Sequence, residues 1–271
     1  MISAILYPIL LIACMGLVLG VCLGIAAKVF KVEQDPKIPL VRECLPGANC
    51  GGCGFAGCDA FAEAVANGVA SVNGCPVGGE KVAKDVASVM GVAASSSEKM
   101  TAYVNCNGNC DKATNKFEYQ GSNDCAFEAT ISGGRKACTY GCLGGGNCVK
   151  ACNFDAIKIV NGIAVVDQDN CVACGACVKA CPKSLIDMVP FAKKVRVTCN
   201  SLDNAAVVMK ACEVGCIGCG KCARICPVEA INITSSNTTP AGKLAKIDYS
   251  KCIQCGKCIG ECPKSTIVKL S

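Results

Sequence analysis

Residues 216–227 read Cys-Ile-Gly-Cys-Gly-Lys-Cys-Ala-Arg-Ile-Cys-Pro, the pattern Cys-x-x-Cys-x-x-Cys-x-x-x-Cys-Pro. Its cysteines are Cys216, Cys219, Cys222 and Cys226, and the pattern recurs twice, as Cys171, Cys174, Cys177 and Cys181 and as Cys252, Cys255, Cys258 and Cys262. Three thiols on one tight loop suit a single metal centre, and this run is typical of [4Fe-4S] ligation, in which the fourth Cys binds the neighbouring cluster. Since no side chain here can move electrons at low potential, the runs predict an electron carrier.

The amino-acid composition excludes several other kinds of metal site. The chain has 271 residues with 28 Cys, no His and no Trp. Without His, Rieske centres, His-ligated haem and most catalytic zinc sites are excluded. A secreted disulfide framework and zinc ribbons are the alternatives, but both fit cysteine triplets poorly. Thiolate-bound clusters need a reducing compartment, so we expect the soluble part in the cytoplasm.

The amino terminus predicts a membrane anchor. Residues 2–27 carry no charge, and Lys28 and Lys31 follow directly. This length exceeds the roughly 20 residues that cross a bilayer core. The flanking lysines predict a single-pass helix over 1–27 in the inner (cytoplasmic) membrane, with the rest of the chain inside. A cleaved signal peptide and a buried core helix are the alternatives, and we expect Cys14 and Cys22 to be small apolar side chains.

A linker over 28–43 leads to a small domain, 44–100, with its own cysteine set. The Asp35-Pro36 and Ile38-Pro39 pairs favour an extended linker. The domain's Gly-rich loop and the later Cys75 predict one four-thiolate [4Fe-4S] site, with the ligands Cys50, Cys53, Cys58 and Cys75. Helices are expected over 59–67 and 80–92, and Cys44 has no evident partner.

An internal repeat organises the remainder into units 101–198 and 199–271. Residues 104–107 resemble 197–200, and the Lys136-Ala137-Cys138 segment resembles Lys210-Ala211-Cys212. In this alignment Gly145 takes the place of Cys219, so the first run lacks one ligand, which Cys138 could supply. Each unit continues into a predicted β-hairpin, the first over 157–166 with its turn at Asn161-Gly162.

Each unit is therefore expected to be a bacterial-type two-cluster ferredoxin-like unit. Together with the anchor and the four-cysteine domain, this predicts an α+β fold with at least five [4Fe-4S] clusters, and six if the spare cysteines bind one. By the interleaved rule the first unit uses Cys138, Cys142, Cys148 and Cys181, then Cys152, Cys171, Cys174 and Cys177. The second uses Cys216, Cys219, Cys222 and Cys262, then Cys226, Cys252, Cys255 and Cys258.

Five cysteines remain in the two units: Cys106, Cys110, Cys125, Cys199 and Cys212. Four of them could bind a sixth cluster that bridges the repeats, and the alternative is that they are spare buried thiols. The sequence leaves both open.

The second half of the chain is basic, with a predicted rim of Lys183, Lys193, Lys194, Arg196, Lys221, Arg224 and Lys257. Such a rim could steer an acidic soluble electron carrier, and the alternative is an ordinary solvated surface. Nucleic-acid binding is not expected, because no aromatic stacking pattern accompanies the basic residues.

The segment 48–60, Ala-Asn-Cys-Gly-Gly-Cys-Gly-Phe-Ala-Gly-Cys-Asp-Ala, followed by Cys75-Pro76 and ferredoxin repeats, resembles the B subunit of Rnf complexes. The two ferredoxin units resemble the longer form of that subunit. The resemblance implies a subunit of an ion-translocating ferredoxin:NAD⁺ oxidoreductase that takes electrons from reduced ferredoxin and relays them to the complex's other membrane and cytoplasmic subunits. The NAD site would then lie elsewhere, and this chain would have no catalytic residues of its own. A related complex that reduces a redox-sensing transcription factor, a cluster-storage or scaffold protein, and a zinc-binding interaction module are the other hypotheses.

Overall fold

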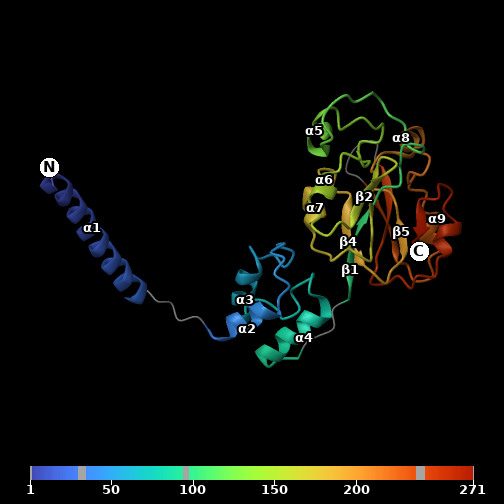
Figure 1. Ribbon diagram of the computed structural model, residues 1–271. Helices are drawn as coiled ribbons and strands as arrows, with labels where there is room; N and C mark the ends of the chain where they lie inside the picture. The colour runs from blue at the N-terminus through green and yellow to red at the C-terminus, as the bar shows by residue number, and fades with distance from the viewer. Residues whose placement is uncertain (1, 30–34, 94–97, 236–241, 271) are drawn as a thin grey trace.

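The computed structural model describes residues 2–29, 35–93, 98–235 and 242–270. Along the chain these form a long helix, a small helical domain, and two similar α+β units that lie side by side (Figure 1). The α+β class and the sequence order of these parts match the prediction.

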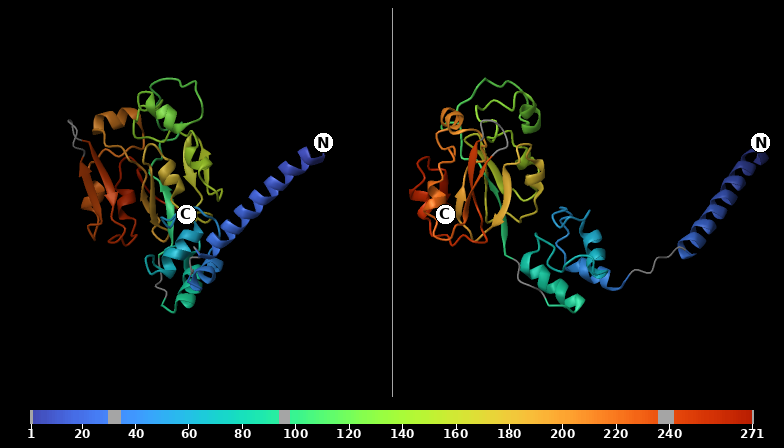
Figure 2. Two further views of the ribbon diagram at one scale, coloured as in Figure 1. Left: turned by 90° about the vertical axis from the view of Figure 1, so that its left-hand side faces the viewer. Right: turned by 180° about the vertical axis from the view of Figure 1, so that it is seen from behind.

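The predicted transmembrane anchor is corrected by the structure. Residues Ile2–Val29 form one helix, α1, which is separated from the rest of the molecule in the right view of Figure 2. A bilayer crossing needs a helix of about 20 predominantly apolar residues. Over the ranges that the structure describes, no helix satisfies both the length and the apolarity of a span. The transmembrane part of the predicted fold class is therefore withdrawn.

The small domain consists of α2 (Lys37–Cys44), α3 (Cys58–Ala66) and α4 (Gly79–Met90). Its core packs Val41 of α2 against Phe61, Val65 and Val86, all of them buried. An extended linker was expected over 28–43, but its residues 37–43 belong to α2. Residues 30–34 of that linker lie outside the described residues. The helix is compatible with the local prolines because Pro36 is its N-cap and Pro39 lies in the first turn, where no intrahelical N–H partner is lost. The expected helices over 59–67 and 80–92 are confirmed as α3 and α4.

Each α+β unit has an inner hairpin and an outer strand pair, both antiparallel. The inner hairpins join β2 (Ile157–Val160) to β3 (Ile163–Val166) and β6 (Ile231–Ser235) to β7 (Lys243–Ile247), which confirms the predicted hairpins. The outer pairs join β1 (Met100–Val104) to β4 (Ile186–Pro190) and β5 (Val195–Val197) to β8 (Ile267–Lys269). Because β5 pairs with β8, the second unit begins before residue 199, the boundary expected from the sequence.

The described helices of the units are short, and four of them contain the cysteine at the third position of a run. In the first unit they are α5 (Cys125–Thr130), α6 (Asn147–Lys150) and α7 (Ala176–Ala180). In the second they are α8 (Ala205–Ala211), α9 (Lys221–Arg224) and α10 (Lys257–Gly260). Both cores mix aliphatic side chains with cysteines, such as Cys142, Cys171 and Cys177 in the first and Cys216, Cys222 and Cys258 in the second. Most of the cysteines of the runs are thus buried or half-buried, whereas Cys219 and Cys255 are exposed.

Candidate metal centres

The cysteine runs share one backbone conformation. The residue before the second cysteine position is left-handed in all four runs of the two units: Gly144, Ala173, Gly218 and Gln254. Ala173 (φ 58°) and Gln254 (φ 59°) adopt it at a steric cost, since residues with a Cβ rarely do so. The first run has the same loop as the others, with Gly145 standing where they carry a cysteine. The shared loop conformation is therefore compatible with a bound metal centre in all four runs.

Three cavities, each of about 20 Å³, lie inside these loops and are lined by four cysteines each. One is lined by Cys216, Cys219, Cys222 and Cys262. Another is lined by Cys152, Cys171, Cys174 and Cys177. Both groups are those expected from the interleaved rule. In both cavities the fourth cysteine of one run therefore reaches the loop of the neighbouring run.

The third cavity differs from the expectation in one residue. It is lined by Cys125, Cys142, Cys148 and Cys181, and Cys138 is not among its lining residues. A Cβ added to Gly145 would lie 3.0 Å from Sγ of Cys125. Cys125 therefore fills the space that the missing cysteine side chain of this run leaves open.

Hydrogen bonds hold Cys125 in that place. Asp124 caps α5 by accepting from the backbone N–H groups of Ala126 and Phe127 at 2.8 and 3.0 Å. The Asn147 side chain, at the start of α6, accepts from the backbone N–H of Cys125 at 2.8 Å and donates to Asp124 at 3.2 Å. No regular spacing marked Cys125 in the sequence, but its neighbour Asp124 is a helix cap, a signal that such reasoning could have used.

Backbone N–H groups point at the sulfurs throughout. Leu185 N donates to Cys181 Sγ at 3.5 Å, and Thr266 N donates to Cys262 Sγ at 3.3 Å, at corresponding positions of the two units. Ala230 N donates to Cys226 Sγ at 3.3 Å, and Ala102 N to Cys171 Sγ at 3.3 Å. Such bonds stabilise thiolate sulfur and tune the potential of a cluster bound to it. The residues present therefore fit [4Fe-4S] groups.

The remaining run of the second unit brings its cysteines together too. The Cys258 thiol has a raised pKa because of burial, and Cys252, Cys255 and Cys226 are close enough to raise it further. The side chain of Gln254 donates from Nε2 to Cys252 Sγ at 3.1 Å. This is the expected set of Cys226, Cys252, Cys255 and Cys258.

In the small domain, Cys53 and Cys58 lie close to Cys75, where burial raises the pKa of the Cys75 thiol. The Asn49 side chain fixes the loop by accepting from the backbone N–H of Cys58 at 2.8 Å, and Gly78 N donates to Cys75 Sγ at 3.4 Å. Gly52 lies against the first unit, because a Cβ there would be 2.9 Å from Cα and O of Cys174. The loop of the small domain thus contacts a ligand loop of the first unit.

A further cavity, of about 30 Å³, is lined by residues of both units. It is lined by Cys106, Cys138, Cys199 and Cys212. Cys110 is exposed, as are Cys14 and Cys22, and Cys44 donates its S–H to Leu40 O within α2 at 3.3 Å. Cys14, Cys22, Cys44 and Cys110 are therefore outside the cysteine groups described above.

Burial makes the free thiols weak acids. It raises the pKa of Cys148 to about 12 and that of Cys177 to about 11. At neutral pH these groups carry their protons, so binding iron as thiolates releases protons. Within the described residues, no three Cys, Asp or Glu side chains are drawn together around a position for a single metal ion.

The predicted basic rim is only partly at the surface. Lys221, Arg224 and Lys257 are exposed, and Lys183, Lys193 and Lys194 are half-buried. Arg196 is fully buried, packed 4.6 Å from the ring of Tyr249 and donating to Pro190 O at 2.7 Å. Arg196 therefore does not belong to a docking rim.

Comparison with known proteins finds iron–sulfur families. Three family models match: "Putative Fe-S cluster" over residues 45–77, "4Fe-4S binding domain" over 164–187 and "4Fe-4S dicluster domain" over 215–266. The chain is 46% identical over 252 residues to the B subunit of the Na⁺-translocating ferredoxin:NAD⁺ oxidoreductase complex of Acetobacterium woodii, covering 93% of this chain and 74% of that one.

Two further relatives extend the comparison. The B subunit of the proton-translocating ferredoxin:NAD⁺ oxidoreductase complex of Clostridium ljungdahlii is 42% identical, covering 74% of this chain and 71% of its own. The B subunit of the ion-translocating oxidoreductase complex of Methanosarcina acetivorans is 44% identical over 92% of each chain. With this identity over most of both lengths, the chain belongs to the family of B subunits of ion-translocating ferredoxin:NAD⁺ oxidoreductase complexes.

Proposed function

We propose that the chain takes electrons from reduced ferredoxin at its second α+β unit and relays them through [4Fe-4S] clusters toward the small domain and the other subunits. Its place as an iron–sulfur electron-transfer subunit of an ion-translocating oxidoreductase follows from the family. The single observation that carries the proposed relay is the grouping of its cysteines in fours around successive cavities.

The proposed ligand sets follow those groups. The small domain holds one cluster on Cys50, Cys53, Cys58 and Cys75. The first unit holds clusters on Cys152, Cys171, Cys174 and Cys177 and on Cys125, Cys142, Cys148 and Cys181. The second holds clusters on Cys216, Cys219, Cys222 and Cys262 and on Cys226, Cys252, Cys255 and Cys258. Cys125 replaces Cys138 in this proposal, because Cys138 lines a different cavity.

Exposure and charge support entry at the second unit. Cys219 and Cys255 are exposed, whereas most of the ligand cysteines are buried or half-buried. The exposed Lys221 and Arg224 of α9 lie beside Cys219, and Arg224 donates to Cys219 O at 3.4 Å. Lys257 of α10, two residues after Cys255, is also exposed. A positive rim around an exposed cluster edge suits an acidic electron carrier, since opposite charge raises the association rate.

The contact between Gly52 and Cys174 supports the small domain as the continuation of the path. The electrons would leave there for partner subunits of the complex, whose ion translocation requires a membrane. We place the clusters on the cytoplasmic side, because low-potential iron–sulfur centres with thiolate ligands belong in a reducing compartment.

Stopped-flow mixing of the anaerobic full chain with reduced ferredoxin tests this function. We expect rapid bleaching of the visible cluster absorbance, slowed several-fold at low salt by the double substitution Lys221→Glu with Arg224→Glu. Lys158→Glu, a charge reversal at an exposed position of β2, is the control and should bleach at the native rate. Absence of bleaching in the native chain would indicate storage or scaffolding instead, and an unchanged rate in the double variant would move the docking site elsewhere.

A further inference from the structure

We propose that Cys106, Cys138, Cys199 and Cys212 bind a sixth [4Fe-4S] cluster that joins the two α+β units. None of the three matched family models includes any of these residues. The existence of this site does not depend on the proposed ferredoxin function, whereas its role as a bridge rests on that function.

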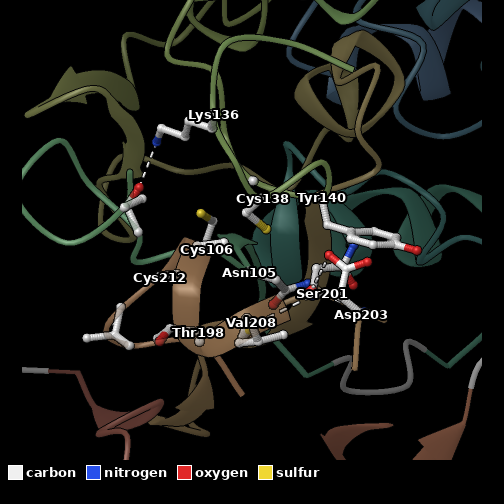
Figure 3. A pocket seen from close by; sticks show the side chains of 18 residues that line it. Asn105, Cys106, Lys136, Cys138, Tyr140, Thr198, Ser201, Asp203, Val208 and Cys212 are labelled. Atoms are coloured by element: carbon white, nitrogen blue, oxygen red, sulfur yellow. Dashed lines mark hydrogen bonds between the residues drawn. The ribbon is translucent and has the colours of Figure 1, made fainter. Parts of the chain in front are cut away.

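The four thiols surround a single cavity. Its volume, about 30 Å³, is not smaller than the about 20 Å³ of each cavity at the ferredoxin-type runs. Cys106 and Cys138 both line this pocket (Figure 3). A Cβ at Gly108 would lie 3.1 Å from Cys212 Sγ and 3.8 Å from Cys106 Sγ, so those two sulfurs flank the same glycine. The absence of a side chain at Gly108 keeps the space between them open.

A backbone N–H group is directed at each of the four thiols. Cys142 N donates to Cys106 Sγ at 3.4 Å, and Cys216 N donates to Cys199 Sγ at 3.3 Å. The backbone N–H groups of Tyr140 and Val214 are directed in the same way at Cys138 and Cys212. These are the same backbone-to-sulfur bonds that mark the ferredoxin-type sites, so the cavity fits a cluster and not merely four unused thiols.

The site has the symmetry of the repeat. Cys106 corresponds to Cys199 in the internal alignment, and Cys138 corresponds to Cys212. Each unit therefore contributes two equivalent ligands, and neither unit could complete the site alone. A single unit of this kind would present two thiols, which explains why these cysteines follow no ferredoxin spacing.

A buried positive charge lies at the same cavity. Lys136 is 4% exposed, and its Nζ donates to Gly108 O at 2.6 Å, the dashed contact in Figure 3, and to Gly162 O at 3.4 Å. Both of these acceptors are neutral carbonyls, so neither hydrogen bond offsets the positive charge of the ammonium. A [4Fe-4S]²⁺ core with four thiolates carries a net charge of about −2, by simple charge counting, and would be stabilised there.

The position of the site connects one cluster of each unit. The N–H donors to Cys106 and Cys199 belong to Cys142 and Cys216, which are themselves proposed ligands of neighbouring clusters. One electron can thus pass from a reduced cluster of the second unit to the oxidised bridge and then to the first unit. No bond forms or breaks in either step, and the electron comes from ferredoxin.

Iron and acid-labile sulfide analysis of the anaerobic full chain tests the site. The native chain should contain about 24 iron atoms, that is six clusters of four. Cys106→Ser and Cys199→Ser should each lose about four of them, whereas Cys110→Ser, at an exposed cysteine outside the cavities, should lose none. Unchanged iron in both cavity variants would overturn the proposal.

Two outcomes remain to be distinguished. If a cavity variant misfolds and loses all its iron, the native count decides, because about 20 iron atoms, or zinc in place of the remainder, would overturn the site. If the variants fold but lack one cluster, reduced ferredoxin should rapidly bleach only the absorbance of the clusters in the second unit. Failure of the native chain to react with ferredoxin would refute the proposed function. The iron count would still test this site independently.

Discussion

At the scale of single residues, Gly145 decides which cysteine completes the first run. A Cβ there would lie 3.0 Å from Cys125 Sγ and 2.9 Å from its backbone N, closer than real side chains pack. We expect Gly145→Ala to displace Cys125 and to remove about four iron atoms per chain although no ligand is deleted. Gly260→Ala is the matched control, since a Cβ there meets nothing within 4 Å. Full iron content in Gly145→Ala would contradict the placement of Cys125.

Lys136 makes a second prediction at this scale. Loss of its buried ammonium should favour the more oxidised, less negative state of a nearby cluster. We therefore expect Lys136→Met to lower one midpoint potential, on the order of tens of millivolts, in an EPR-monitored redox titration. Lys158→Met removes an exposed charge of β2 and should leave every potential in place. Identical titrations for Lys136→Met and the native chain would show that the lysine faces no cluster.

At the scale of elements, the α5 segment is held by one ion pair. Glu128 is fully buried and accepts from Arg135 through both carboxylate oxygens, at 2.8 and 2.7 Å. Although burial opposes ionisation, the hydrogen bonds of Arg135 hold the pKa of Glu128 below its ordinary value. Glu128→Ala leaves Arg135 without its partner and should cost roughly 3 kcal/mol.

The measurement for this pair is the urea midpoint at which cluster absorbance is lost. We expect a lower midpoint in Glu128→Ala and early loss of the cluster that Cys125 ligates. Glu118→Ala, at an exposed position of the same segment, should unfold like the native chain. Coincident curves for the two variants would mean that the ion pair does not hold the ligand.

The contact between the small domain and the first unit gives another prediction at this scale. Gly52→Val would push its side chain into the backbone of Cys174 and separate the two ligand loops. We expect all clusters to assemble, but electron transfer between the first unit and the small domain to slow by at least tenfold in freeze-quench EPR. Gly260→Val provides the control. A native rate in Gly52→Val would place the exit of the path elsewhere.

At the scale of the whole molecule, local sequence patterns predicted the repeated cysteine loops and a hairpin but missed features that depend on contacts between distant segments. The spacing of the runs located two four-cysteine cavities correctly, and the Asn161-Gly162 turn located its hairpin. The pairing of β5 with β8 and the helix at 37–44 depend on packing across long separations, which local patterns do not encode. Hydropathy alone also suggested a membrane span at α1 that the described structure does not support.

The place of Cys138 shows the same limit. From the sequence, it was the nearest spare thiol to the gap at Gly145. In the fold, α5 brings Cys125 to that gap from another direction, and Cys138 turns to the cavity between the units. Distance along the chain was a poor guide here because the four cysteines that line the cavity between the units come from both repeats.

The metal content of the anaerobically purified full chain, measured together with acid-labile sulfide and Mössbauer spectra, tests the central claim most directly. The account predicts a brown protein with about 24 iron atoms, an equal amount of sulfide, and spectra of cubane clusters alone. A colourless protein, one that contains zinc, or one whose iron lacks matching sulfide would contradict it.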